Sequence, residues 1–344
     1  MNGGKIMYPP LWLEINKVFW KISESFGWLG QMYFYKLIFL LCHLLTSWII
    51  YKISKIFNSE GGLAKSNLPL LYLLNPLLLF EFAVNAHFDA LMLLLIAGGL
   101  YLVFRKNTII GLWLIATSIL IKYTAIIFLP FVIGYLLYQA FENKKVKTTL
   151  IKIVIAGLAS IALAAITFYP YWIKIGPRIF DGISRQSDWF INSVFATFYV
   201  PIISIYKAIF GHQIFSVSAK FLWISLILVG LAIFIRYCLK KASHKELVTP
   251  FVWLGASGLA VTLFLIFAQR SFWPWYATWA LLPVALLKTK DKIWRLTTIF
   301  SLSSLAFYIP LAFLGQNSTN ILDTWQILYG VVVFAPVLFY LRQI

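Results

Sequence analysis

Four polar residues stand within nine positions between two apolar runs of this chain: Glu81, Asn85, His87 and Asp89. An Asn-Pro pair ends or kinks the apolar run before them. Glu81, Asn85 and Asp89 recur every four residues, so a helix would stack them on one face, whereas an irregular turn would also bring in His87. Because a carboxylate costs about 2.5–3.5 kcal/mol within a bilayer, the cluster predicts a polar cavity near the membrane interface. Two alternatives remain: a solvated loop in which Asp89 caps the next helix, and a carboxylate site for a divalent cation.

A second candidate is Lys122, which has apolar residues on both sides. Its ammonium is suited to bind, as a point charge, a phosphate that arrives in the plane of the membrane. The alternative is a lysine whose stem lies in the apolar layer while its head reaches the interface.

The segment 268–279 combines Arg270 with a Trp-Pro-Trp-Tyr run that contains Trp275 and Tyr276. Arginine can grip a phosphate with two hydrogen bonds, and aromatic faces pack against the C–H surfaces of sugars. Aromatic residues at a membrane edge are also ordinary interfacial anchors. The longest connection, 170–213, adds Arg185 and Asp188, which either pair with each other or line a carbohydrate or phosphate cleft.

The elements that must position these residues are membrane helices. Of the 344 residues, 61% are apolar and 12% are charged, against about 45–50% and about 25% in soluble domains. A soluble fold cannot cover that much apolar surface. We expect an all-α, multi-pass bundle that forms a single integral membrane domain, 1–344, with about eleven spans: 33–57, 66–80, 90–104, 108–121, 124–141, 149–169, 214–236, 248–268, 275–287, 297–314 and 325–341.

Charge sets the expected orientation in a cell membrane. Alternating the spans gathers 18 of the 29 basic residues on one side, which we take as cytoplasmic: Lys52, Lys55, Lys65, Arg105, Lys106, Lys144, Lys145, Lys147, Lys152, Arg236, Lys240, Lys241, Lys245, Lys288, Lys290, Lys292, Arg295 and Arg342. The other face receives the loop 170–213 and residues 1–30, read as a turn and an interfacial helix. The net charge of +18 then reflects topology and contact with anionic membrane lipids rather than a nucleic-acid partner.

Taken together, these stretches resemble the polyprenol-phosphate-sugar-dependent glycosyltransferases of the GT-C fold, above all bacterial mannosyltransferases of family 87 and the alpha-mannosyltransferase type. The matching pieces occur in the same order over nearly the whole chain: Tyr8-Pro9-Pro10-Leu11, Asn75-Pro76, Asn85-x-His87-x-Asp89, Lys122 followed by Pro130, and Pro274-Trp275-Tyr276 with Trp279 and Pro283.

The resemblance implies a membrane glycosyltransferase with its active site on the extracytoplasmic face. A hexose, expected to be mannose, would pass from a polyprenyl-phosphate donor to a lipid-linked or cell-envelope glycan acceptor. No cofactor is firmly implied. The residues then divide by role: Asp89 and Glu81 as catalytic carboxylates, Lys122, Arg270 and Arg185 on the donor phosphate, and Asn85, His87, Trp275, Tyr276 and Asp188 on the sugar or acceptor.

One departure from the family concerns the start of the chain. In that family a helix normally precedes the Tyr-Pro-Pro segment, and the loop after that helix supplies the acidic residue taken as the base. This chain begins at the Tyr-Pro-Pro segment, so we expect a copy that is truncated or inactive. If it is active as given, Asp89 or Glu81 must substitute. Two other hypotheses stay open: a transporter or flippase of lipid-linked saccharides, and an inactive partner subunit.

Overall fold

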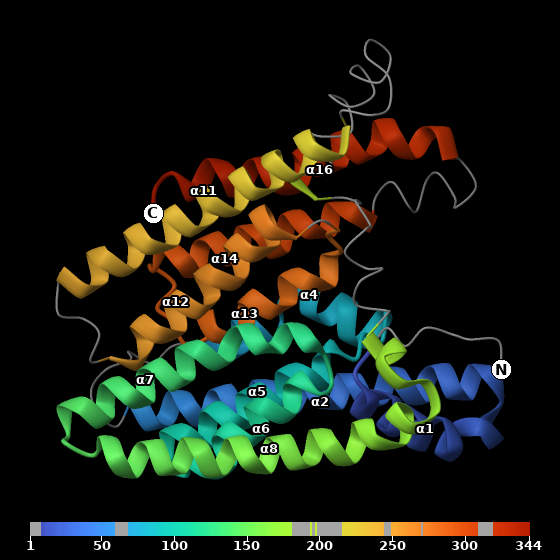
Figure 1. Ribbon diagram of the computed structural model, residues 1–344. Helices are drawn as coiled ribbons and strands as arrows, with labels where there is room; N and C mark the ends of the chain where they lie inside the picture. The colour runs from blue at the N-terminus through green and yellow to red at the C-terminus, as the bar shows by residue number, and fades with distance from the viewer. Residues whose placement is uncertain are drawn as a thin grey trace. The chain divides into compact units, whose positions relative to one another are not determined.

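The computed structural model describes residues 8–58, 68–180, 193–194, 197, 215–243, 249–269, 271–308 and 319–344. Helices make up most of these residues, and no β-strand occurs among them (Figure 1). The predicted all-α class is therefore confirmed. The chain divides into two compact units, unit 1 being Met1–Ser187 with Leu247–Leu254 and unit 2 being Asp188–Glu246 with Gly255–Ile344.

Unit 1 holds the helices of the first half of the chain. In order they are α1 (Pro10–Ser23), η1 (Glu24–Phe26), α2 (Gly27–Asn58), α3 (Leu68–Leu73), α4 (Pro76–Leu79), η2 (Phe80–Val84), α5 (Asp89–Phe104), α6 (Thr108–Ile119), η3 (Tyr123–Phe128), α7 (Leu129–Glu142), α8 (Val146–Ile175) and η4 (Gly176–Phe180).

Helix α1 folds back along the first part of α2. The reversal follows η1, where Gly27 has a φ of 67° that a glycine adopts without strain. The Phe19 ring lies 6.0 Å from that of Tyr35, and nearer the start of α1 the Trp12 ring lies 6.2 Å from that of Phe39. This antiparallel hairpin carries the N-terminal segment to the level of Phe39 on α2.

Large apolar side chains remain exposed along this hairpin, among them Val18, Trp20, Ile22 and Phe26. Such a surface is typical of a helix that lies in the membrane interface. The interfacial position of residues 1–30 remains a prediction.

The chain bends sharply between η2 and α5, where the two helical segments meet at 120°. Before the bend, Asn75 caps α4 by accepting hydrogen bonds from the amides of Leu77 and Leu78. Proline at the first position of α4 needs no amide partner there. The Asn-Pro pair therefore stops one short helix and starts the next, as its composition predicts.

Helices α5 and α6 form an antiparallel pair. The chain reverses at Lys106, whose φ is 64°. A Cβ atom on Gly99 would lie 2.6 Å from the carbonyl oxygen of Gly111, and one on Gly111 would lie 2.7 Å from that of Gly99. Glycines at such a crossing let two membrane helices approach closely. The pair therefore places the start of α5 and the end of α6 at the same end of unit 1.

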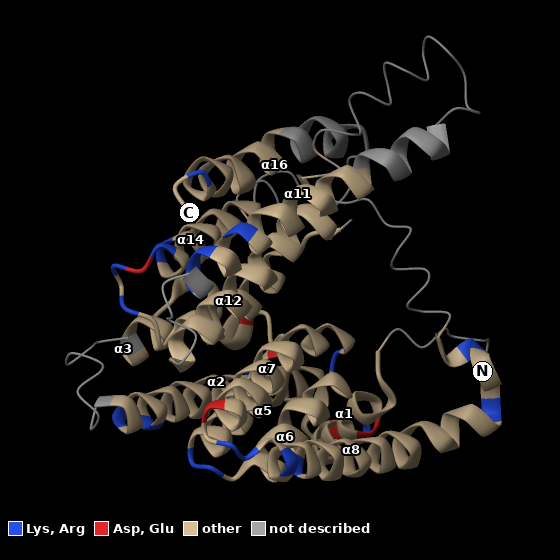
Figure 2. Cartoon of the chain, turned by 60° about the vertical axis from the view of Figure 1, so that its left-hand side comes forward, with Lys and Arg blue, Asp and Glu red and all other residues tan. Residues whose placement is uncertain are grey.

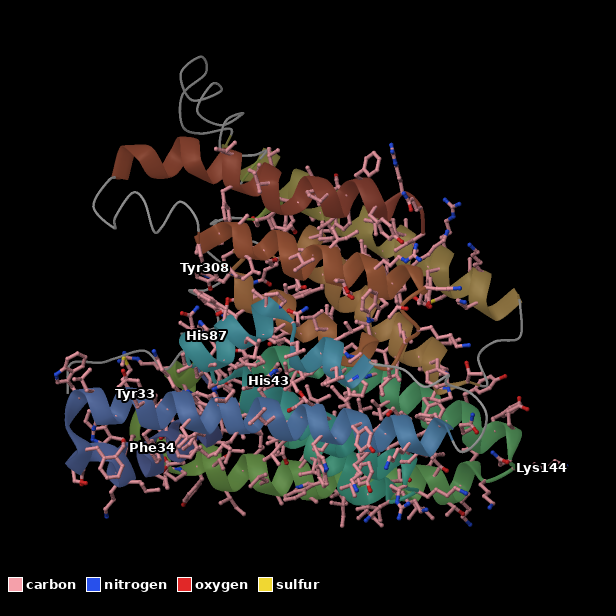
Figure 3. All side chains as sticks on the ribbon, turned by 180° about the vertical axis from the view of Figure 1, so that it is seen from behind. Tyr33, Phe34, His43, His87, Lys144 and Tyr308 are labelled. Atoms are coloured by element: carbon pink, nitrogen blue, oxygen red, sulfur yellow. The ribbon has the colours of Figure 1, made fainter. Side chains whose placement is uncertain are left out.

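The basic loops of unit 1 lie at its opposite end. The turns after α5 and α7 contain Arg105, Lys106, Lys144 and Lys145, and Lys55 lies in the last turn of α2. The ends of α2 and α5 meet there, with the Phe57 and Phe104 rings 5.0 Å apart. Figure 2 shows these blue segments away from α1, and Figure 3 places Lys144 far from Tyr33 and Phe34.

Unit 2 holds the helices of the second half. They are α11 (Phe215–Ser243), most of α12 (Pro250–Leu263), η6 (Phe264–Ala268), η7 (Pro274–Ala277), α13 (Thr278–Val284), α14 (Lys292–Ser304), η8 (Leu305–Phe307) and α16 (Thr319–Leu341). Its core includes the fully buried rings of Phe272, Phe300 and Phe334.

The predicted count of about eleven spans is not confirmed. Among the described residues, five helical segments are long and apolar enough to cross a membrane, or six if the bent pair counts as one span. The apolar run 66–80 folds, where described, into the short α3 and α4. In the run 275–287 the helical segments are η7 and the seven-residue α13, which has Pro283 in its last turn. In these two runs, proline and capping residues divide the apolar stretch into helices too short for a straight crossing. Helix α8 reaches Ile175, five residues beyond the predicted start of the loop 170–213, most of which lies outside the described residues.

Candidate functional site

The centre of the candidate site is a buried ion pair. Lys122 Nζ donates to both carboxylate oxygens of Asp89, at 2.8 and 3.1 Å. Asp89 is fully buried and Lys122 is 9% exposed. These positions exclude the solvated loop for Asp89 and the outward-reaching head for Lys122. Two ions that are removed from water are stable only as a well-made pair. The charge on each of these two residues therefore depends on the other.

The α5–α6 pair explains why these two residues meet. Asp89 is the first residue of α5, where the positive end of the helix dipole favours an anion. Lys122 follows the last turn of α6, and its own amide bonds the carbonyl of Ser118. The negative end of that helix favours a cation. Residues 33 positions apart in sequence thus come together through one helix crossing.

Aromatic rings from the N-terminal segment cover this pair. Phe88 stacks on Trp12 with ring centroids 4.4 Å apart, and Tyr8 meets Phe88 edge-on at 5.1 Å. The Lys122 ammonium lies 5.2 Å from the centroid of the Phe88 ring. Burial of the Tyr8 side chain raises its pKa, and the nearby Asp89 charge raises it further. The Tyr-Pro-Pro segment and the Asp89–Lys122 pair therefore form one site.

A second polar cluster joins Glu81, Asn85 and His87. The Asn85 side-chain amide donates to Glu81 Oε2 at 3.0 Å. His87 Nε2 lies 3.4 Å from the same oxygen, and its backbone amide donates to the Glu81 carbonyl. Glu81 is fully buried, whereas the His87 side chain is 23% exposed. His87 is thus the partly accessible member of a cluster with a buried carboxylate beneath it.

The local backbone explains why His87 joins this cluster. The π-helical turn η2 ends at Val84, and Ala86 takes a positive φ of 56°. This left-handed residue turns the chain, so His87 comes back toward Glu81 instead of pointing away as it would on a regular helix. The irregular turn that the sequence left as one possibility is the conformation present.

The charge state of His87 follows from its burial. His87 lies in the turn between η2 and α5, outside either helix. Burial lowers its pKa to about 4, because the imidazolium loses its hydration, and the Lys122 charge acts in the same direction while Asp89 opposes it. His87 is therefore neutral at pH 7, with its Nε2 3.4 Å from Glu81 Oε2.

This lowered pKa predicts how stability depends on pH. In the unfolded chain His87 titrates near its ordinary value of about 6.5. The stability that a neutral His87 contributes is present above that pH and is lost as the pH falls toward 4. Between pH 7.5 and 5, we expect detergent-solubilised protein to lose on the order of 1–2 kcal/mol more stability than the His87→Gln variant. Thermal denaturation at both pH values measures this, and equal losses in the two proteins would contradict it.

Five site residues of the sequence analysis cannot be joined to this cluster. Arg185, Asp188 and Arg270 lie outside the described residues. Trp275 and Tyr276 belong to unit 2, where Trp275 stacks on Trp273 with ring centroids 5.0 Å apart. Their predicted roles remain predictions.

Sequence reasoning did not single out four residues near the ion pair. Trp12 and Phe88 form the aromatic cover, yet in the sequence they are ordinary aromatic residues. Tyr123 and Thr124, directly after Lys122, each bury a hydroxyl oxygen that has no hydrogen-bond partner in the structure. A buried hydroxyl without a partner commonly marks a place for water or a ligand. In the sequence, the feature that could have pointed to Tyr123 and Thr124 is their position directly after Lys122.

No group of three or more His, Cys, Asp or Glu side chains in the described part of the chain is arranged to hold a metal ion. The Asp89 carboxylate accepts from Lys122, and the Glu81 carboxylate accepts from Asn85. In the described part of the chain, these carboxylates are therefore not arranged together as ligands for a divalent cation.

Known mannosyltransferases are similar to the part of the chain that carries this site. Residues 5–139 match the family described as Alpha-(1->6)-mannopyranosyltransferase, N-terminal domain. A Corynebacterium glutamicum protein, Alpha-(1->6)-mannopyranosyltransferase A, is 26% identical over 149 residues, covering 38% of this chain and 30% of that protein. The match thus spans less than a third of the length of this relative. It confirms the resemblance to bacterial alpha-mannosyltransferases, and the matched range contains Tyr8, His87, Asp89 and Lys122.

Proposed function

We propose that this chain, which is similar to bacterial alpha-mannosyltransferases over residues 5–139, is a membrane glycosyltransferase. It moves a hexose, mannose in the simplest case, from a polyprenyl-phosphate donor to a lipid-linked or cell-envelope glycan acceptor. The single observation that carries the proposal is the buried Asp89–Lys122 pair beneath the Tyr8 and Phe88 rings. Buried charged residues of this kind are energetically costly in a membrane protein and commonly mark functional sites.

The face of the membrane follows from charge. The α5–α6 pair places Asp89 and Lys122 at one end of unit 1 and the basic turn with Arg105 and Lys106 at the other, and Figure 3 shows His87 far from Lys144. Cytoplasmic loops carry the excess of Lys and Arg in membrane proteins. We therefore assign the site to the extracytoplasmic face.

We assign the donor phosphate to Lys122. Asp89 holds the Lys122 ammonium by its two carboxylate oxygens, so the positive charge is fixed in place. A phosphate would be attracted to this fixed cation. As the glycosidic C–O bond breaks, negative charge grows on the leaving phosphate, and a fixed cation in a water-poor site stabilises that charge. Asp89 acts in this scheme as the positioning residue for Lys122.

We assign the proton of the acceptor hydroxyl to the His87–Glu81 pair. Both Asp89 oxygens already accept from the Lys122 ammonium, so Asp89 is poorly placed to take this proton. His87 is neutral at pH 7, is partly exposed and lies 3.4 Å from the Glu81 carboxylate. As the acceptor oxygen bonds to the oxocarbenium-like anomeric carbon, His87 takes the hydroxyl proton, and Glu81 stabilises the resulting imidazolium.

Six further residues complete the proposal. Arg270 and Arg185 add positive charge to the donor phosphate, and Trp275 and Tyr276 offer aromatic faces to a sugar. Asp188 and Asn85 supply hydrogen-bond partners for sugar hydroxyls.

The direct test is sugar transfer by membranes that contain the full chain. Membranes from an expressing host receive a polyprenyl-phosphate donor with labelled mannose, and label in lipid-linked or glycan products is measured against membranes lacking the chain. We expect label in a product that depends on the chain and on Lys122, with Lys145→Gln at the opposite end as the matched control. Absence of transfer with mannosyl and glucosyl donors overturns the proposal, and movement of donor across the bilayer without bond formation would indicate a flippase.

A further inference from the structure

A groove on the outside of unit 1 lies between α2 and α3. It has a volume of about 460 Å³ and is lined by Leu44, Ser47, Trp48, Tyr51, Pro69, Leu70 and Leu73. The lining is apolar or aromatic except for Ser47, whose hydroxyl already donates to the carbonyl of His43. A hydrocarbon chain is the chemistry that such a lining accepts.

Two lysines stand over the aromatic walls of this groove. Lys52 Nζ lies 5.0 Å from the centroid of the Trp48 ring, and Lys55 Nζ lies 4.6 Å from that of Tyr51. Each lysine follows its aromatic residue by one helical turn, so both ammonium groups lie toward the C-terminal end of α2. The groove therefore has an apolar body and a cationic end, which matches a lipid with a negatively charged headgroup.

The position of the lysines decides between two kinds of anionic lipid. The Asp89–Lys122 site lies at the level of Phe39 on α2, through the contacts of Trp12 with Phe39 and Phe88. Sixteen residues separate Phe39 from Lys55, which is about 24 Å of helix, close to the ~30 Å of a hydrocarbon core. A phosphate at Lys52 and Lys55 is thus in the opposite leaflet from one at Lys122.

We propose that this groove, between α2 and α3, binds one anionic phospholipid of the leaflet at the basic end of unit 1. One acyl chain lies along Leu44, Trp48 and Leu70, and the headgroup phosphate contacts Lys52 and Lys55. The site is separate from that of the sugar donor, and it does not depend on the activity proposed above.

The test is lipid retention by the purified full chain. Protein is delipidated in detergent, titrated with dioleoylphosphatidylglycerol or dioleoylphosphatidylcholine, and examined by native mass spectrometry. We expect one retained phosphatidylglycerol, and we expect Lys52→Gln/Lys55→Gln to weaken its binding about tenfold or more, from roughly 1 kcal/mol per lysine near an anionic lipid. Lys144→Gln/Lys145→Gln, at the same basic end but away from the groove, should change it less than twofold.

A second variant tests the apolar half of the site. Leu70→Trp narrows the groove without changing charge and should also weaken phosphatidylglycerol retention, with an unchanged thermal midpoint showing that the fold is intact. Equal losses from the two lysine pairs, or equal retention of phosphatidylcholine, overturn the proposal in favour of a general lipid shell. Preferred retention of added undecaprenyl phosphate overturns it in favour of a polyprenyl site.

Discussion

Replacing Asp89 by Asn should lower sugar transfer at least about tenfold and destabilise the protein, because it leaves the Lys122 ammonium buried without its counter-charge. Breaking a buried ion pair from one side costs about 3–5 kcal/mol. If half of this free energy were added to the activation barrier for sugar transfer, the rate of transfer would fall by about tenfold or more. Transfer of labelled mannose and the midpoint of thermal denaturation measure the two effects. Glu24→Gln, an exposed carboxylate on η1, is the matched control and should change neither.

The double variant Asp89→Asn/Lys122→Met separates a catalytic from a structural pair. Removing both charges together relieves the uncompensated charge, so stability should return close to that of the unchanged protein. Transfer should not recover with stability, because the cation for the donor phosphate is missing. Recovery of transfer in the double variant would falsify the assignment of Lys122 to the donor phosphate. Full activity of Asp89→Asn alone would remove this pair from the site.

The second large effect is expected from one methyl group at the α5–α6 crossing. In Gly99→Ala, the new Cβ would lie 2.6 Å from the Gly111 carbonyl oxygen and 2.5 Å from Ile115 Cγ1. The helices must separate, at a cost of about 1–3 kcal/mol. Because Asp89 and Lys122 sit at the ends of these two helices, transfer should fall by up to about 10²-fold, the cost of a displacement near 1 Å.

Gly98 provides the control for this experiment. A Cβ on Gly98 would meet only Leu114 Cδ1, at an ordinary 3.7 Å. Gly98→Ala therefore changes the neighbouring residue of the same helix without a clash, and better helix propensity should hold or slightly raise stability. Thermal midpoints and transfer rates of the two alanine variants are compared. Equal behaviour of Gly98→Ala and Gly99→Ala would show that the crossing does not position the site.

The sequence by itself determined that this chain forms membrane helices, and it determined which residue types its candidate site contains. An apolar, charge-poor composition admits membrane helices because backbone polar groups must bond within the chain in a bilayer. Glu81, His87, Asp89 and Lys122 could be selected because ionisable groups between apolar runs are costly and so are seldom incidental. The break between α3 and α4 at Asn75 and Pro76 is likewise a local property, which the residue types predict.

Only the tertiary structure decided which of these residues act together. Sequence periodicity describes one helix at a time, whereas the Asp89–Lys122 bond depends on how α5 crosses α6, through two glycines that lack any distinctive pattern. Likewise, the left-handed Ala86 that returns His87 to Glu81 is not a residue type that favours a positive φ. Contacts between segments depend on packing geometry, which no spacing along the chain encodes, and the pairing of the site's charges is such a contact.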